Sequence, residues 1–268
     1  MTRAQEWRIA FISDPHGDLV ALNKVVSDLK SAGPVDEVLI GGDLAQGGAQ
    51  PAEVVDEIRS RGWPSVRGNG DDLLVRVAGG SPPHELFSKA HGGKVPERVA
   101  SLASRSVRLL GTERIDYLRS LPISLERGPF PFGKLLLVHA TPWSTEEVVL
   151  PDADSEMAAR MVREARARLL VYGHIHTPYQ RRVGDAVLMS IGAVSGSNDA
   201  DPRPAYTIVT LGTTIVAEVR RVDWPPAQRL ADYTAAGIEL SEERRSSLER
   251  PGPFPVRSRP GSAVRLWP

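Results

Sequence analysis

The stretch Arg-Ile-Ala-Phe-Ile-Ser-Asp-Pro-His-Gly-Asp, residues 8–18, decides the fold prediction for this chain. Its apolar run, residues 9–12, is continuous and not alternating, which favours a strand buried on both faces of a sheet. The run leads directly to Asp14 and His16, two side chains that can bind a metal ion. Ligands gather in the loops after strands of α/β sheets, because the strand fixes the position of the loop. The stretch therefore predicts a buried strand that ends in a functional site.

The same arrangement of an apolar run followed by a polar side chain recurs along the chain. The runs 38–40, 64–66, 135–138 and 169–172 lead in turn to Asp43, Asn69, His139, and His174 with His176. These seven side chains are more than one tetrahedral ion needs, but they are enough for two ions if Asp43 bridges the pair. Carboxylate, amide and imidazole ligands suit divalent cations such as manganese, iron or zinc. Such a pair would keep an excess of positive charge and attract a phosphate.

Helical spacing separates the predicted strands in the first half of the chain. Apolar residues recur at three and four positions in 19–29 and 54–58, and again in 157–165. Later, the segments 186–191, 205–211 and 214–222 follow one another through short turns, which is typical of antiparallel strands. The pattern predicts strand–helix units followed by an antiparallel portion.

The composition excludes several classes of protein. The chain has 268 residues, with 33 Lys plus Arg against 33 Asp plus Glu, so a nucleic-acid coat or a membrane-surface binder is not expected. It has no cysteine, so disulfides and thiolate metal sites are impossible. Residues 1–7 lack the apolar core of a signal peptide, and no apolar run could cross a bilayer. We expect a soluble cytoplasmic protein without a stable nucleic-acid complex or a membrane partner, and its oligomeric state is left open.

The motifs together resemble one family. In the order Asp14-x-His16, Gly42-Asp43, Gly68-Asn69, His139 and Gly173-His174-x-His176, they are similar to the calcineurin-like metallophosphoesterase superfamily. The segments 190–194 and 201–206 resemble the Asn-Pro-Gly-Ser-Val and Asp-Pro-Arg segments of its small bacterial and archaeal, phosphodiesterase-type branch. The resemblance covers the chain from about residue 8 to about residue 210.

This resemblance implies an α/β fold, a four-layer αββα sandwich with mixed central sheets. We expect the metallophosphoesterase domain over 1–222, in which the Gly- and Pro-rich region 79–111 is an insertion or a lid. A C-terminal helical appendage is expected over 223–250, with a helix broken near Gly237. The Pro- and Arg-rich tail, 251–268, is expected to be extended or partly disordered.

The resemblance also implies ligand roles. Asp14, His16, Asp43 and His176 would hold the first ion, and Asp43, Asn69, His139 and His174 the second. Asp43, Asn69 and His139 are the residues we assign to catalysis. We expect two divalent metal ions, with manganese as the first choice and iron, zinc or nickel as alternatives. The implied reaction is attack on phosphorus by a hydroxide that the two metals generate.

One position departs from the family pattern. Gly70 stands where the superfamily usually has a histidine that protonates the leaving oxygen or binds the phosphate. The absence of this histidine favours substrates with good leaving groups, so we expect a phosphodiester or a nucleotide polyphosphate. His84 and His91 are candidates to replace it, and Arg203 is a candidate phosphate contact because guanidinium binds oxyanions well.

Three alternatives remain beside this hypothesis. Within the superfamily, the chain could be a phosphomonoesterase or a protein Ser/Thr phosphatase. A different class is a catalytically weak binding scaffold, which Gly70 favours and the complete ligand set opposes. A dinucleotide-binding protein is disfavoured, because Gly17 is the one glycine in the first turn and no Gly-x-Gly-x-x-Gly follows that strand.

Overall fold

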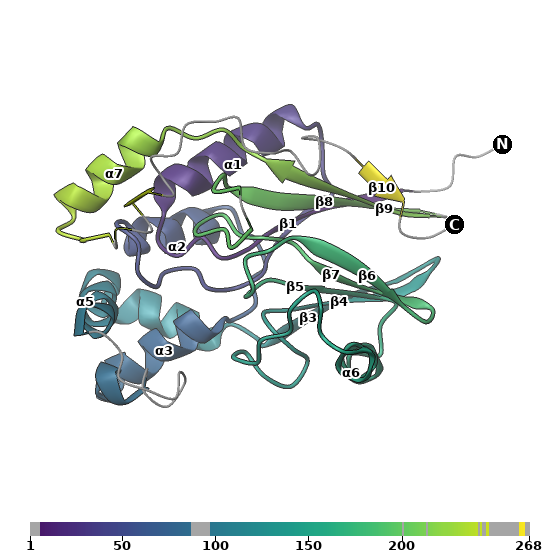
Figure 1. Cartoon of the computed structure of the whole chain (residues 1–268), viewed down its shortest axis with the longest axis horizontal. Coiled ribbons are helices and arrows are strands. Elements are labelled where there is room, and N and C mark those ends of the chain that lie inside the picture. Colours follow the sequence, from purple (N-terminus) through teal and green to yellow (C-terminus); the bar gives the residue numbers. More distant parts are fainter. Residues whose placement is uncertain are drawn as a thin grey trace.

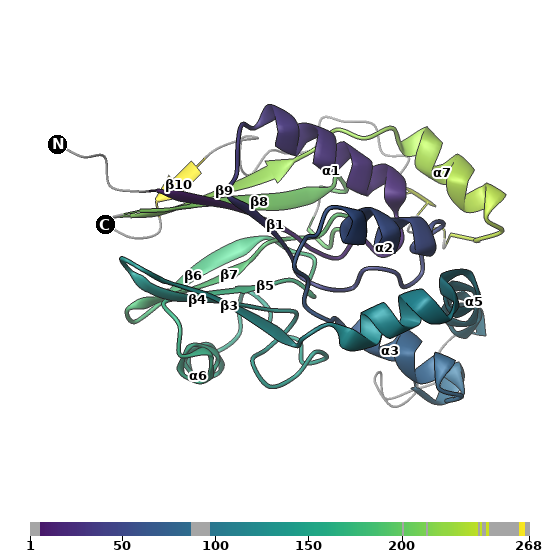
Figure 2. The ribbon, with the colours of Figure 1, turned by 180° about the vertical axis from the view of Figure 1, so that it is seen from behind.

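Two sheets face each other in this protein, and helices cover their outer sides (Figure 1). The computed structural model describes residues 6–86, 97–199, 201–212, 214–240, 242, 245–246 and 263–265. Seen from behind, the same layers are visible, with α1, α2 and α7 beside one sheet and α6 beside the other (Figure 2). The four-layer αββα fold predicted from the sequence is confirmed.

The first sheet has five strands in the order β10-β9-β8-β1-β2. Their bounds are β1 Trp7–Ile12, β2 Glu37–Ile40, β8 Ala205–Leu211, β9 Ile215–Arg221 and β10 Ala263–Arg265. β1 pairs parallel with β2 and antiparallel with β8, and β9 pairs antiparallel with both β8 and β10. The sheet is therefore mixed, and residues 263–265 of the predicted tail are an edge strand.

The second sheet also has five strands, in the order β3-β4-β5-β7-β6. Their bounds are β3 Ser124–Phe130, β4 Gly133–Val138, β5 Leu169–Tyr172, β6 Tyr179–Val183 and β7 Ala186–Ser190. The central strands β4, β5 and β7 run parallel, whereas β3 and β6 pair antiparallel at the two edges. The parallel strands bring the loops after β4 and β5 to one end of the sheet.

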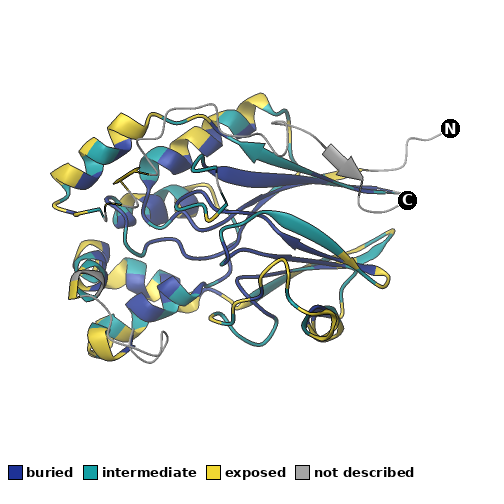
Figure 3. Ribbon diagram, in the orientation of Figure 1, coloured by how far each residue is buried: buried dark blue, intermediate teal, exposed yellow. Residues whose placement is uncertain are grey.

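Side chains of the strands alternate between two cores. Ile9 and Phe11 point between the sheets, where they pack with residues such as Leu137 and Val171. Ala10 and Ile12 point outward to the helices of the first sheet. Each fully buried aliphatic or aromatic side chain contributes about 1.5–3 kcal/mol, so strands buried on both faces hold the site rigidly. Figure 3 shows these strands as the most buried part of the ribbon.

The helices have the following bounds: α1 Leu19–Ser31, α2 Pro51–Ser60, α3 Asn69–Ala78, α5 Glu97–Ser120, α6 Ser155–Ala165 and α7 Pro226–Ala235. α1 begins after Asp18, whose side chain accepts the backbone N–H of Ala21 and so caps the helix. α7 ends just before Gly237, which has a positive φ of 67°, as the predicted break requires. No helix in the part of the chain that the structure describes combines the length and the apolar character needed to span a membrane.

The region 79–111 is described only in part. Residues 97–111 lie in α5, where Ala103 and Leu110 are buried in the same core as α1 and α2. Residues 87–96, which include His91, lie outside the described residues. A lid over 79–111 stays a prediction, although residues 97–111 belong to a helix that packs into the core.

Candidate metal centre

The predicted ligands lie where strands end. Asp14 and His16 follow β1, Asp43 follows β2, His139 follows β4, and His174 with His176 follows β5. Asn69 is the first residue of α3. Five of these ligands have a positive φ, between 48° and 63°: Asp14, His16, Asp43, His174 and His176. In the described residues Arg166 is the one other non-glycine residue with a positive φ, so local strain concentrates at this site, as it does at functional sites generally.

The first ligand group joins β1 to β5. His176 Nε2 lies 3.2 Å from Asp14 Oδ1 and 3.1 Å from His16 Nε2. The backbone N–H of His174 donates to Asp14 Oδ2 at 3.2 Å, which fixes the two loops against each other. Asp14, His16 and His176 offer ligand atoms that all lie within 4.8 Å of one another, close enough to hold one cation.

The second group joins α3 to β4. His139 Nε2 lies 2.9 Å from Asn69 Oδ1, and the rings of His139 and His174 have centroids 5.0 Å apart. Asp14, Asp43 and His139 also offer atoms within 4.8 Å of one another. Asp14 therefore belongs to both sets of atoms, and Asp43 joins the second set.

Asp43 stands between the groups. Its Oδ2 lies 3.6 Å from His16 Nε2, and its Oδ1 lies 3.6 Å from His139 Nε2. The two oxygens of one carboxylate thus face opposite ligand groups. This is the arrangement that a bridging carboxylate needs.

Backbone carbonyls orient three of the imidazoles. Nδ1 of His139 donates to the carbonyl of Gly41 at 2.7 Å, and Nδ1 of His176 donates to that of Gly196 at 2.7 Å. Nδ1 of His16 lies 3.1 Å from the carbonyl of Gln46. A proton on Nδ1 leaves the lone pair on Nε2, which is the atom that faces the other ligands in each case. Metal-binding histidines are held in this way.

The chemistry of the donor set fits divalent cations. Nε2 of His174 is buried and has no hydrogen-bond partner among the described residues, a costly state that a bound ion would relieve. The two acceptor nitrogens of His16 and His176 face each other, which is unfavourable unless a cation or a proton lies between them. Asp14 and Asp43 are buried carboxylates, and burial of an unpaired charge is expensive.

Burial and neighbouring charges shift the pKa values of Asp14 and His174. Burial alone would raise the pKa of Asp14, but the hydrogen bond and charge of His176, together with the charges of His139 and His16, outweigh it and lower the pKa below its usual value. Burial lowers the pKa of His174, and the neighbouring His139 lowers it further. Asp14 therefore stays ionised and His174 stays neutral near neutral pH, the protonation states that ligands require.

Asp71 supports the loop that carries Asp43. Its buried carboxylate accepts backbone N–H groups of Asp43, Leu44 and Gly68 at 3.0, 2.9 and 3.0 Å. Burial and the charge of Asp43 raise the pKa of Asp71 to about 7. Gly68 has to be glycine, because a Cβ there would overlap the Asp43 carboxylate. Asp71 thus supports the predicted ligands from behind, whereas Asp72 pairs with Arg67 at 2.7 Å.

Arg203, one of the predicted substrate contacts, is paired with acidic side chains. Arg203 binds both oxygens of Asp201, with Nη2 2.7 Å from Oδ2 and Nε 3.0 Å from Oδ1, and it also pairs with Asp223. His84 is exposed beyond the end of α3, which begins at the centre and leads about 15 Å away from it. Their roles toward a substrate stay predictions, as does that of His91.

Two hollows are found in the part of the chain that the structure describes, and none of the seven predicted ligands lines either of them. One, of about 260 Å³, is lined by residues that include Asp72, Thr141, Trp143 and Thr145. Thr141 comes two residues after His139, and Asp72 lies about one helical turn after Asn69, so two residues that line this hollow are close along the chain to the second ligand group. Arg160 covers one face of the Trp143 ring at 3.9 Å, which favours packing over base stacking for that face.

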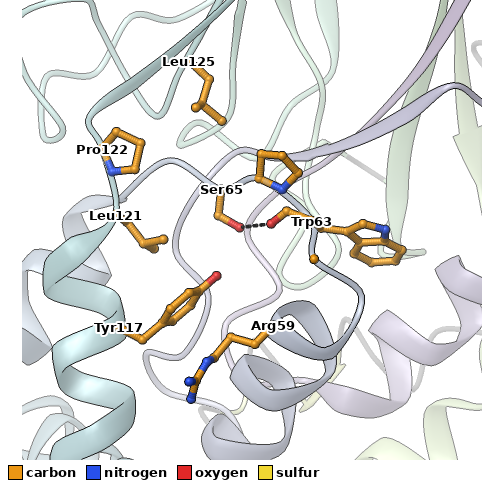
Figure 4. A pocket seen from close by; sticks show the side chains of 9 residues that line it. Arg59, Trp63, Ser65, Tyr117, Leu121, Pro122 and Leu125 are labelled. Carbon is orange, nitrogen blue, oxygen red and sulfur yellow. Dashed lines mark hydrogen bonds between the residues drawn. The ribbon is translucent and has the colours of Figure 1, made fainter.

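The other hollow is separate from the ligands. It measures about 370 Å³ and is lined by Arg59, Trp63, Ser65, Tyr117 and neighbouring apolar side chains (Figure 4). Ser65 donates to the carbonyl of Trp63 at 3.0 Å across it. None of the seven ligands lines this hollow.

Some residues of the site could not be predicted from the sequence. The carbonyls of Gly41, Gln46 and Gly196 orient imidazoles, but every residue has a carbonyl, so no residue type marks them. Arg229 is a second case: its Nε lies 2.5 Å from Asp18 Oδ2, behind the first ligand loop. An arginine in a chain rich in arginine gives no signal of its own.

Comparisons with known proteins agree with this geometry. A family model for the calcineurin-like phosphoesterase superfamily domain matches residues 7–214. An uncharacterized protein from Methanocaldococcus jannaschii is 30% identical over 188 residues, which are 69% of each chain.

Solved structures share the fold. A metallophosphoesterase from Sphaerobacter thermophilus is similar with a TM-score of 0.68 and 25% identity, over 90% of this chain and 98% of that one. A hypothetical protein from Pyrococcus horikoshii has a TM-score of 0.74 at 19% identity, over 90% and 97% of the two chains, and it supports the fold alone. The chain belongs to the calcineurin-like phosphoesterase superfamily and is a metallophosphoesterase, a hydrolase of phosphoric ester bonds.

Proposed function

We propose that this enzyme hydrolyses phosphodiester or nucleotide polyphosphate bonds with a binuclear centre of two divalent cations, manganese being the first choice. One observation carries the two-ion part of the proposal. The oxygens of Asp43 face His16 and His139 at the same distance, 3.6 Å, from opposite sides. A single-ion site has no use for a carboxylate placed between two ligand groups.

The residues of the chain prepare the chemistry. When bound, two cations would lower the pKa of a shared water and neutralise charge on the phosphoryl group. Asp14 and Asp43 supply the negative charge that holds the cations, and both are almost completely buried, so little water screens them. The hydrogen bonds from Nδ1 of His139 and His176 to carbonyls keep their Nε2 atoms aimed at the centre.

The leaving group determines the preferred substrate. Gly70 offers no side chain that could protonate a leaving oxygen, and His84 is exposed beyond α3. Without a general acid, hydrolysis is fastest when the leaving group is a stable anion, such as a phosphate or an aryl oxide. The hollow lined by Asp72 and Thr141, which are close along the chain to Asn69 and His139, would offer room for the second substituent of a diester or an anhydride. These observations favour a phosphorylated small molecule or a nucleotide over an alkyl monoester.

A substrate panel tests the proposal. The purified protein is assayed with manganese, iron, zinc and nickel against bis(para-nitrophenyl) phosphate, para-nitrophenyl phosphate, dinucleoside polyphosphates, cyclic nucleotides and a phosphopeptide. We expect turnover of the diesters or polyphosphates and weaker turnover of the monoester. Turnover of the monoester or the phosphopeptide alone would favour the phosphomonoesterase or protein phosphatase alternative.

Metal content separates the enzyme from the scaffold alternative. We expect two ions per chain by elemental analysis, and activity that a chelator removes and added metal restores. A protein that binds no metal and hydrolyses none of the panel would be a binding scaffold. A cytoplasmic location fits a chain without cysteine and is proposed on that basis.

A further inference from the structure

Gln46 lies beside the candidate metal centre, three residues after Asp43 in the loop that follows β2. Its backbone carbonyl faces Nδ1 of His16 at 3.1 Å, which fixes the main chain of the loop. Its side chain is half-buried and extends toward the first turn of α3. The two parts of Gln46 therefore face different neighbours.

The side-chain amide occupies the space over Gly70. A Cβ at position 70 would lie 2.9 Å from Gln46 Oε1 and 3.0 Å from Asp43 Oδ1. The amide and the carboxylate oxygen that faces His139 thus flank one and the same small space. Gly70 also donates its backbone N–H to Asp43 Oδ1 at 2.6 Å.

Space, and not backbone conformation, favours glycine at position 70, because a Cβ there would make the Gln46 side chain or the Asp43 carboxylate shift. Gly70 lies in the first turn of α3 and is not among the glycines with a positive φ. An alanine could adopt the same helical backbone, but its methyl group would push against the Gln46 amide. The small residue at 70 and the amide of Gln46 therefore form one arrangement.

We propose that Gln46 binds the substrate: Oε1 of its side-chain amide faces Gly70, and Nε2 of the same amide donates a hydrogen bond to a phosphoryl oxygen on the Asn69–His139 side of the centre. This inference rests on the proposed function. An amide donates without transferring a proton and keeps its charge of zero at every pH. It therefore orients the phosphoryl group and stabilises its developing charge without assisting the leaving group. Its backbone carbonyl, and not its side chain, supports His16, so the side chain can be changed without removing that support.

The first test is Gln46→Ala, with Gln50→Ala as the matched control. Gln50 is also half-buried and lies in the same loop region, but its side chain contacts Asp232 at 3.4 Å and not the centre. In Gln46→Ala we expect unchanged binding of two manganese ions by calorimetry. We expect kcat/KM for bis(para-nitrophenyl) phosphate to fall about 10- to 100-fold, as when one aligned donor to developing charge is removed. Inhibition by inorganic phosphate should weaken about 10-fold, and Gln50→Ala should match the wild type in all three measurements.

The second test is a double-mutant cycle with Gly70→Ala. The new methyl group presses on both the Gln46 amide and Asp43, and its effect through Asp43 is present whether or not the amide is there. If the amide acts on the substrate, Gly70→Ala costs clearly less in the Gln46→Ala background than in the wild type. Additive losses would overturn the proposal.

The outcomes separate the two proposals. A wild type that hydrolyses no member of the panel contradicts the proposed function. A wild type that is active, with Gln46→Ala equal to it in kcat/KM and in phosphate inhibition, overturns the role of Gln46 alone. Loss of metal binding in Gln46→Ala would also overturn it, because the side chain would then hold the loop and not the substrate.

Discussion

The carboxylate of Asp71 accepts the backbone N–H of Asp43 at 3.0 Å, so one acidic residue fixes the main chain of the other. The same carboxylate accepts the N–H groups of Leu44 and Gly68. It thereby joins the loop after β2 to the start of α3, the two segments that supply Asp43 and Asn69. The spacing between Asp43 and Asn69 depends on this contact.

Asp71→Ala should weaken both stability and metal binding. Three buried N–H groups would lose their acceptor, which costs about 3 kcal/mol or more of unfolding free energy. Because the partner behind the ligands is lost, manganese affinity should fall about 10- to 100-fold. Urea denaturation and calorimetry measure the two effects. The control is Asp72→Ala, whose partly exposed ion pair with Arg67 should be worth less than about 1 kcal/mol. Equal losses in the two variants would contradict the supporting role of Asp71.

Asp43→Ala should reduce the bound metal from two ions to one or none and lower kcat at least about 1,000-fold, because each ligand group loses one oxygen of the carboxylate between them. Elemental analysis and the diester assay check this expectation. Asp185→Ala is the control, since the Asp185 side chain is 79% exposed and pairs with Arg168 at the surface. A variant that keeps two ions would show that Asp43 does not bridge them.

Arg229→Ala should destabilise the fold although Arg229 lies outside the residues that the family model matches. Its guanidinium is 3% exposed, pairs with Asp18 and donates to Ser195 Oγ at 2.6 Å. Removing one partner of a buried ion pair costs about 3–5 kcal/mol. Arg229→Lys should recover only part of the loss, because a lysine cannot reach both partners with a planar fork.

Urea denaturation measures these changes. Gln228→Ala, on the exposed side of the same helix, is the control and should change stability by less than about 0.5 kcal/mol. If Arg229→Ala unfolds at the same urea concentration as the wild type, α7 is not held by this ion pair.

Asp28 should make the stability depend on pH in the acid range. Burial alone would raise the pKa of Asp28, but hydrogen bonds from Arg220 and Tyr206, at 2.7 and 2.8 Å, lower it below its usual value. The folded state thus favours the ionised form. The stabilisation is complete above the unfolded value of about 3.8 and is lost as the pH falls through the lower folded value.

Comparison of the wild type with Asp28→Asn tests this expectation. At pH 7 the wild type should be more stable by about 1–2 kcal/mol, and the difference should shrink as the pH falls from 4 to 2. Asp223→Asn is the control, because its side chain is 92% exposed and it should show no such trend. A difference that is constant with pH would contradict an ionised Asp28 as the source.

Much of the fold could be predicted from local patterns. The runs at 169–172 and 205–211 coincide with β5 and β8, and the helical spacing from residue 19 marks α1, because burial on one or both faces leaves a periodic trace in the sequence. Other elements left no such trace. β3 and β6 are edge strands with mostly half-exposed side chains, and α5 follows a Gly- and Pro-rich segment and is interrupted at Gly111.

The sequence by itself predicted the family and the sandwich fold, which are confirmed, and it predicted the types of ligand, because each predicted ligand follows a buried strand or begins a helix. Tertiary structure alone decided which oxygen of Asp43 faces which histidine and which carbonyls orient the rings. It also decided that Gln46 lies over Gly70 and that Arg229 reaches Asp18. These contacts join residues far apart along the chain. They depend on how sheets and helices pack, and packing geometry leaves no periodic signal in the order of the residues.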